Sequence, residues 1–175
     1  MQYTPSALEA KDANVLVEGK SDFYILSWYK KNHGENLKLN FLPVNGVTNA
    51  SAVLSLLLGW AKDFVFLHDS DAEGKAAKKR YQAELPISLE HFAEYEDIFG
   101  SEKTSPKQIE GLLSANDKAK IAKFYDTKKV SKSQIQRYFS SSLVGKDAIE
   151  LDEQSLSNLA KLTHHLMKML AANEN

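Results

Sequence analysis

The first half of the chain alternates short apolar segments with segments of helical periodicity, and this alternation limits the possible folds more than any other feature. Apolar segments of strand length lie at 14–17, 39–43 and 64–67. Each is followed by apolar residues at helical spacing, at 22–33, 48–61 and 73–84. Short β-α-β connections favour parallel strands joined by right-handed crossovers. The sequence therefore predicts an α/β fold of the Rossmann-like kind.

The second half has a different pattern. Its periodicity predicts helices at 106–113, 116–125, 131–140 and 156–171, the last with a leucine stripe. A weaker apolar segment at 87–92 is a candidate fourth strand, which gives a parallel sheet of about four strands flanked by helices. We expect an α/β core over residues 1–105 and a helical extension over 106–175. The extension either packs on or beside the core or forms one continuous domain with it.

Composition excludes several classes of protein. The 175 residues include no cysteine, so disulfides, thiolate catalysis and cysteine-ligated zinc are excluded. The hydrophobic fraction of 43% and the charged fraction of 26% are typical of soluble globular proteins. The longest apolar run, 52–61, is too short to cross a bilayer. We expect a cytoplasmic protein with no membrane partner.

Two aspartates follow the third apolar segment directly. Because residues i and i+2 of an extended chain point the same way, Asp69 and Asp71 are expected to project to one place at the strand end. Carboxylates crowded in this way repel each other unless a cation neutralises them, and oxygen ligands select magnesium, manganese or calcium. One such aspartate is often only a helix cap, but two together with Glu73 exceed what a cap requires.

A second acidic pair follows the first apolar segment. Glu18 ends the predicted strand, and Asp22 lies one helical turn further on, so the two can reach the same side. Alternatively, Ser21 or Asp22 caps the helix and Glu18 interacts with its dipole. The intervening Gly19-Lys20-Ser21 is not a phosphate-binding P-loop, because Asn14 stands where that motif requires glycine. The carboxyl ends of parallel strands meet at one edge, where ligands bind, so both pairs are expected there.

Four residues of the second half are further candidates. Glu110 is flanked by apolar residues, and by its position alone it is an ordinary surface acid. Lys128, Lys129 and Lys132 are candidates for stabilising charge on a phosphate, and the sequence does not choose among them. All three belong to a basic block between residues 117 and 137, which is either a nucleic-acid contact or a solvated helical face. Its basic residues are Lys118, Lys120, Lys123, Lys128, Lys129, Lys132 and Arg137.

Taken together, the segments 15–22, 42–46 and 66–75 resemble the Toprim domain of topoisomerases, bacterial primases and nucleases. Within that group the chain looks most like the OLD (overcoming lysogenization defect) nucleases. Glu18 and Asp22 match their first motif, and Asp69, Asp71 and Gly74 match their Asp-x-Asp-x-x-Gly segment. The segment 109–112 resembles a later Ile-Glu-Asp-Leu motif. Gly111 replaces its second acid, so only Glu110 carries over.

This resemblance implies a magnesium- or manganese-dependent endonuclease that cleaves or nicks DNA phosphodiester bonds in phage defence. One or two ions are expected, with calcium as an inactive substitute. The expected metal ligands are Glu18, Asp22, Asp69, Asp71, Glu73 and Glu110. Lys129 or Lys132 is the expected downstream basic residue. Double-stranded DNA is favoured as the substrate, and RNA stays open.

OLD proteins carry an ATPase domain before the Toprim domain, and this chain has no Walker motif. We therefore expect either an excised carboxyl-terminal domain or a free-standing relative that works with an ATPase domain on a partner. Two alternatives share the same fold: a primase-like or RNA-processing Toprim enzyme, and a non-catalytic Toprim module. A receiver-like or phosphatase-like domain is less consistent, because such domains place their key aspartate after an earlier strand.

Overall fold

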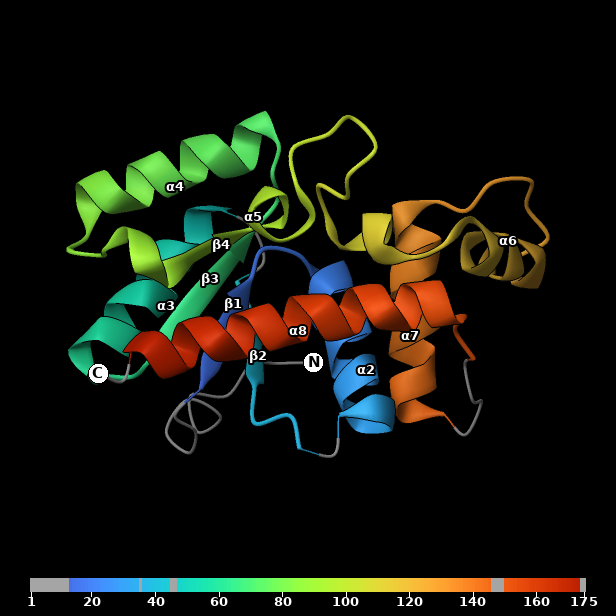
Figure 1. Ribbon diagram of the computed structural model, residues 1–175, viewed down its shortest axis with the longest axis horizontal. Helices are drawn as coiled ribbons and strands as arrows, with labels where there is room; N and C mark the ends of the chain where they lie inside the picture. The colour runs from blue at the N-terminus through green and yellow to red at the C-terminus, as the bar shows by residue number, and fades with distance from the viewer. Residues whose placement is uncertain (1–12, 35, 45–46, 146–149, 174–175) are drawn as a thin grey trace.

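The computed structural model describes residues 13–34, 36–44, 47–145 and 150–173. A four-stranded parallel sheet in the order β2-β1-β3-β4 forms its centre (Figure 1). The strands are β1 (Asn14–Val17), β2 (Asn40–Pro43), β3 (Phe64–His68) and β4 (Phe92–Glu94). The predicted α/β class with a parallel sheet of about four strands is confirmed. The fourth strand begins at Phe92, the last residue of the segment expected for it, and runs two residues beyond, because a 3-10 helix η1 (Leu89–His91) occupies the preceding residues.

Helices connect the strands and continue after the sheet. The first three are α2 (Lys20–His33), α3 (Val47–Gly59) and α4 (Ala72–Glu84). After β4 come α5 (Tyr95–Phe99), the 3-10 helix η2 (Ile109–Leu112), α6 (Ala115–Phe124), α7 (Lys132–Val144) and α8 (Glu153–Asn173). The second half is thus helical, as its periodicity predicts.

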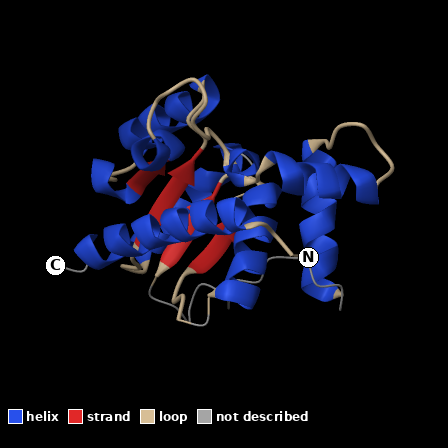
Figure 2. Cartoon of the chain, turned by 45° about the vertical axis from the view of Figure 1, so that its right-hand side comes forward, coloured by secondary structure: helices blue, strands red, loops and turns tan. Residues whose placement is uncertain are grey.

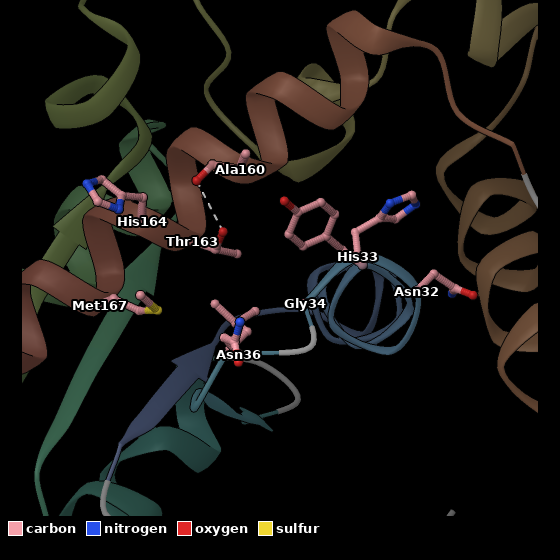
Figure 3. A pocket seen from close by; sticks show the side chains of 10 residues that line it. Asn32, His33, Gly34, Asn36, Ala160, Thr163, His164 and Met167 are labelled. Carbon is pink, nitrogen blue, oxygen red and sulfur yellow. Dashed lines mark hydrogen bonds between the residues drawn. The ribbon is translucent and has the colours of Figure 1, made fainter.

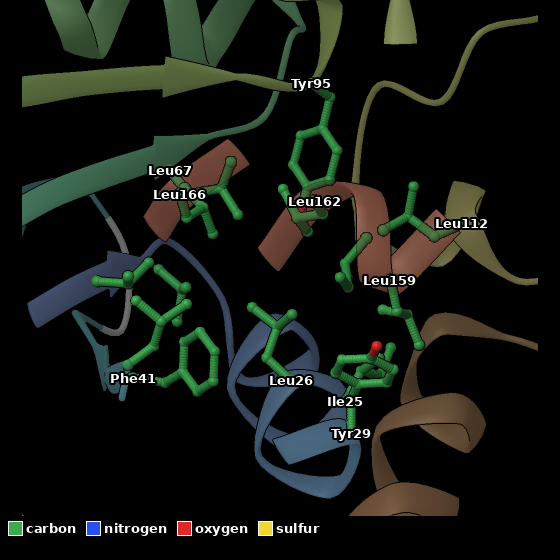
Figure 4. Packing of buried hydrophobic residues seen from close by; sticks show 14 of the residues in the cluster. Ile25, Leu26, Tyr29, Phe41, Leu67, Tyr95, Leu112, Leu159, Leu162 and Leu166 are labelled. Carbon is green, nitrogen blue, oxygen red and sulfur yellow. The ribbon is translucent and has the colours of Figure 1, made fainter. Parts of the chain in front are cut away.

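The strands alternate their side chains between two hydrophobic clusters. Val17 and Leu67 face the cluster that contains α2, α7 and α8 (Figure 4), whereas Leu16 and Phe66 face α3 and α4. Helix α8 lies across one face of the sheet (Figure 2), where Leu159, Leu162, Leu166 and Leu170 of its leucine stripe are buried. Phe139 of α7 packs edge-on against Trp28 of α2, with ring centroids 5.4 Å apart. The first cluster therefore contains side chains from both sides of the boundary expected at residue 105.

The expected helix at 106–113 is wrong. The chain instead reaches η2 through irregular backbone, and only Ile109–Leu112 is helical. Pro106 has no amide hydrogen to donate, and the backbone of Gly111 packs directly on it: a Cβ at Gly111 would lie 3.1 Å from Cα and Cβ of Pro106. This folded-back arrangement buries Ile109, Glu110 and Leu112 together. Within the described residues, no helix combines the length and the apolar character that a membrane span requires.

Candidate metal and phosphate site

The first contact of the site joins the ends of two neighbouring strands. β1 pairs with β3 so that Val17 lies opposite Leu67, and the residues that follow both strands therefore leave the sheet together. The backbone amide of Asp69 donates to Oε2 of Glu18 over 3.4 Å. Burial raises the pKa of Glu18, and this amide partly offsets the effect. The expected convergence of these two segments on one sheet edge is thus present.

Asp22 lies on the first turn of α2 and is only 3% exposed. Its Oδ1 accepts a hydrogen bond of 2.9 Å from the hydroxyl of Tyr95. A Cβ at position 19 would lie 2.9 Å from Oδ2 of Asp22, so Gly19 leaves the space that this carboxylate occupies. Burial raises the pKa of Asp22 to about 6, although the Tyr95 hydrogen bond opposes the rise. A buried carboxylate held in this way is not a simple helix cap.

Asp69 has the most perturbed carboxyl group of the site. Burial, together with the charges of Asp22, Glu18 and Glu110, raises its pKa to about 8, although the charge of Lys132 opposes the rise. Its backbone is held by Gly74 of α4, since a Cβ there would lie only 2.0 Å from the carbonyl oxygen of Asp69. The following helix can approach the backbone of Asp69 so closely only because residue 74 is glycine.

Glu110 enters the same cluster from η2. It is 6% exposed, and in the described part of the chain neither of its carboxylate oxygens accepts a hydrogen bond. The ammonium group of Lys132 lies 3.5 Å from Oε1, an ion-pair distance. The charges of Glu110, Asp69 and Asp22 raise the pKa of Lys132 against the effect of burial. One lysine thus faces carboxylates from three separate elements.

Asp71 and Glu73 lie at the rim of this cluster. Both are exposed, and Oδ1 of Asp71 accepts from the amide of Gly74 at 2.9 Å as the N-cap of α4. Strand β3 ends at His68, so Asp69 and Asp71 follow the strand rather than extend it. The charges of Asp71 and Glu73 nevertheless raise the pKa of Glu18, which places them within electrostatic reach of the buried acids.

The structure separates the two candidate lysines. Lys132 is the first residue of α7, and its charge acts on Glu18, Asp22 and Asp69. Lys129 is exposed in the preceding turn, and its charge is not among the main ones that shift the pKa of these acids. Lys132 therefore belongs to the acidic cluster, and Lys129 lies outside it.

Tyr95 is the member of the site that sequence reasoning missed. It is fully buried and lies 73 residues from its partner Asp22. Tyr95 directly follows β4, so the signal that could have found it is a confident prediction of that strand, which places residue 95 at the same sheet edge. His68, by contrast, faces the α4 side, where its ring lies 3.9 Å from that of Phe66.

Comparison with known proteins adds no family to this geometry. No family model, curated protein or solved structure matches this chain. The Toprim resemblance therefore remains a prediction from motifs, and what the site can do has to be argued from its own chemistry.

The donor set fits a hard divalent cation. Glu18, Asp22 and Glu110 bring carboxylates within electrostatic reach of Asp69, and the charge of Lys132 acts on all four acids. The buried oxygens of Glu110, which lack a donor among the described residues, mark a position where a further positive charge would be stabilised. Within the described residues no three acidic or histidine side chains form a group that could hold a metal ion as they stand.

A hollow of about 710 Å³ lies elsewhere, between α2 and α8 (Figure 3). It is lined by Asn32, His33 and Gly34 at the carboxyl end of α2, and by His164 and Met167 of α8. Asp22 lies near the opposite end of α2, about 16 Å away along the axis at 1.5 Å per residue. This hollow is therefore separate from the acidic cluster.

Proposed function

We propose that the chain is a magnesium- or manganese-dependent nuclease domain of the OLD Toprim type, which nicks or cleaves DNA. One observation carries the proposal: Glu18, Asp22 and Glu110 come from separate segments, yet the charge of each raises the pKa of Asp69. The amide of Asp69 donates to Glu18 over 3.4 Å, and Lys132 lies 3.5 Å from Glu110. Burying like charges together costs free energy, so their convergence needs a compensating ligand. A divalent cation is the ligand that such oxygen donors select.

The expected metal ligands divide by burial. Asp22, Asp69 and Glu110, together with Glu18, would form the inner set. The exposed Asp71 and Glu73 would serve a second ion or its water ligands. A bound ion would polarise the phosphoryl oxygen and lower the pKa of a bound water molecule.

The protein's own groups would position the substrate. The ammonium group of Lys132 would face the charge that develops on the phosphate, while remaining within 3.5 Å of Glu110. Tyr95 would hold Asp22 in one rotamer through its 2.9 Å hydrogen bond. Phosphoryl transfer depends mainly on positioning and charge neutralisation, which is what this arrangement offers.

Nicking of supercoiled plasmid DNA with magnesium or manganese tests the proposal. Asp69→Asn should reduce the rate at least about 100-fold, since a metal ion contributes several kcal/mol and about 1.4 kcal/mol corresponds to tenfold. The matched control is Glu102→Gln, which removes the same charge from an exposed residue of the loop after α5. Equal nicking by Asp69→Asn and Glu102→Gln would remove the proposed site. Parallel reactions with single-stranded DNA and structured RNA would identify the preferred substrate.

A further inference from the structure

A groove of about 490 Å³ lies beside the acidic cluster, between α6 and the beginning of α7. Lys118, Lys128, Lys129 and Lys132 line it, and Glu110 is its acidic lining residue. We call it the lysine groove. Ala119, Ala122, Val130 and Ile135 supply apolar side chains to its wall.

The structure divides the basic block of the sequence into two groups. Lys120 forms an ion pair with Asp117, with 2.9 Å between the ammonium group and Oδ1. Lys120 does not line the groove. Lys123 also lies outside, on an exposed part of α6. The lysines of the groove outnumber its single acid, so the groove has a net positive charge. Burial lowers the pKa of Lys118, which indicates an ammonium group that is partly removed from water.

Two residues belong both to the groove and to the acidic cluster. Glu110 and Lys132 line the groove, and the charge of each acts on Asp22 and Asp69. The groove therefore begins where the acidic cluster ends. A strand whose phosphate faces Lys132 would place its neighbouring linkages along the groove.

We infer that the lysine groove binds the backbone phosphate next to the bond that is cleaved. This inference rests on the proposed function and adds a substrate requirement to it: the strand has to extend past the cleaved bond on the groove side. Lysine ammonium groups contact phosphate oxygens as point charges and read no base. The groove would therefore position the strand without selecting its sequence.

Binding measurements test the groove without requiring catalysis. The probe is a fluorescently labelled single-stranded oligonucleotide in calcium, titrated at several salt concentrations. Lys128→Gln/Lys129→Gln should weaken binding and flatten the slope of log affinity against log salt by roughly 0.7 for each phosphate that the variant no longer neutralises. The matched control Lys103→Gln/Lys123→Gln removes two exposed charges outside the groove and should leave the slope nearly unchanged. Equal flattening in both double variants would mean diffuse attraction and would overturn the inference.

Cleavage patterns locate the bound phosphate. In magnesium, an oligonucleotide with one uncharged methylphosphonate linkage should lose cleavage at that linkage and at one neighbouring bond on one side. In Lys128→Gln/Lys129→Gln the methylphosphonate should no longer affect cleavage at the neighbouring bond, because the altered groove no longer binds that phosphate. Loss confined to the methylphosphonate itself would contradict the groove. If the wild type binds with the expected slope but cleaves nothing, the proposed function fails while the phosphate groove stands.

Discussion

The ammonium group of Lys132 lies 3.5 Å from Oε1 of the buried Glu110, and this pair joins the lysine groove to the acidic cluster. The sequence places the two residues on different helical segments with no motif between them. Under the proposed function, this pairing would put Lys132 beside the phosphate on which charge develops.

Replacing the two candidate lysines should give different kinetic effects. Lys132→Gln should lower kcat by about 10²–10³, as the loss of one preorganised electrostatic donor does in other enzymes. Lys129→Gln should raise KM and leave kcat within a few-fold, because Lys129 lines the groove outside the cluster. Steady-state cleavage of a labelled oligonucleotide measures both. The reverse assignment, with kcat lost only in Lys129→Gln, would place the phosphate elsewhere.

Asp69→Asn should stabilise the protein when no divalent metal is present. The folded state raises the pKa of Asp69 to about 8 from an ordinary 3.8, so it favours the protonated form. The stability that the protonated Asp69 contributes to the folded state is fully present below pH 3.8 and is lost as the pH rises through 8. In EDTA, the melting temperature of the variant should exceed that of the wild type more at pH 8.5 than at pH 5. About 1 kcal/mol corresponds to roughly 2–4 °C in a chain of this size.

Magnesium should reverse the order of the two melting temperatures, so that the wild type becomes more stable than Asp69→Asn. It should raise the melting temperature of the wild type at pH 8.5, because binding to the folded state adds stability, and leave Asp69→Asn nearly unchanged. A gain from magnesium that is the same in both proteins would show that the ion binds away from Asp69.

Tyr95→Phe should impair the site through its effect on Asp22, although Tyr95 is not itself a proposed metal ligand. The variant removes the donor to Oδ1 of Asp22 and leaves a buried carboxylate without that partner, at a cost of about 1–3 kcal/mol. Because the lost hydrogen bond lowers the pKa of Asp22, the ascending limb of the pH-rate profile should move to higher pH. Positioning groups of this kind typically contribute about 10–100-fold to metal affinity or activity. An unchanged pH profile would assign Tyr95 to packing alone.

Two glycine substitutions should have opposite effects on stability. Gly74→Ala would place a Cβ 2.0 Å from the carbonyl oxygen of Asp69, so α4 has to move and the melting temperature should fall. The control Gly59→Ala meets nothing within 4 Å at the end of α3 and should stabilise by about 0.5–1 kcal/mol. Thermal unfolding in EDTA compares them. Equal stability of the two variants would show that α4 does not need the close approach to Asp69.

The sheet could be predicted because its buried strands are continuous apolar runs bounded by polar residues. The segments 14–17 and 64–67 are of this kind, and the observed strands match them within one residue. The helix expected at 106–113 was wrong because local periodicity does not register how Pro106 and Gly111 fold the chain back on itself.

Strand topology alone predicts the site only where its residues follow strands, whereas Glu110 and Lys132 are expected there through the family resemblance. Glu18 and Asp69 lie at adjacent strand ends, and the rule for parallel sheets brings them together. Tyr95 reaches Asp22 from 73 residues away, and nothing local to either residue indicates the contact. The choice of Lys132 over Lys129 depends on where α7 begins and how its first turn is oriented, which spacing alone does not fix.

Anomalous diffraction from crystals soaked in manganese chloride tests the central claim most directly, because it locates the ion. The account predicts a peak bonded to Asp69 and to at least one of Glu18, Asp22 and Glu110, and no such peak in Asp69→Asn crystals. An acidic cluster without manganese in the wild type, at a concentration that saturates any metal-dependent cleavage, would contradict it.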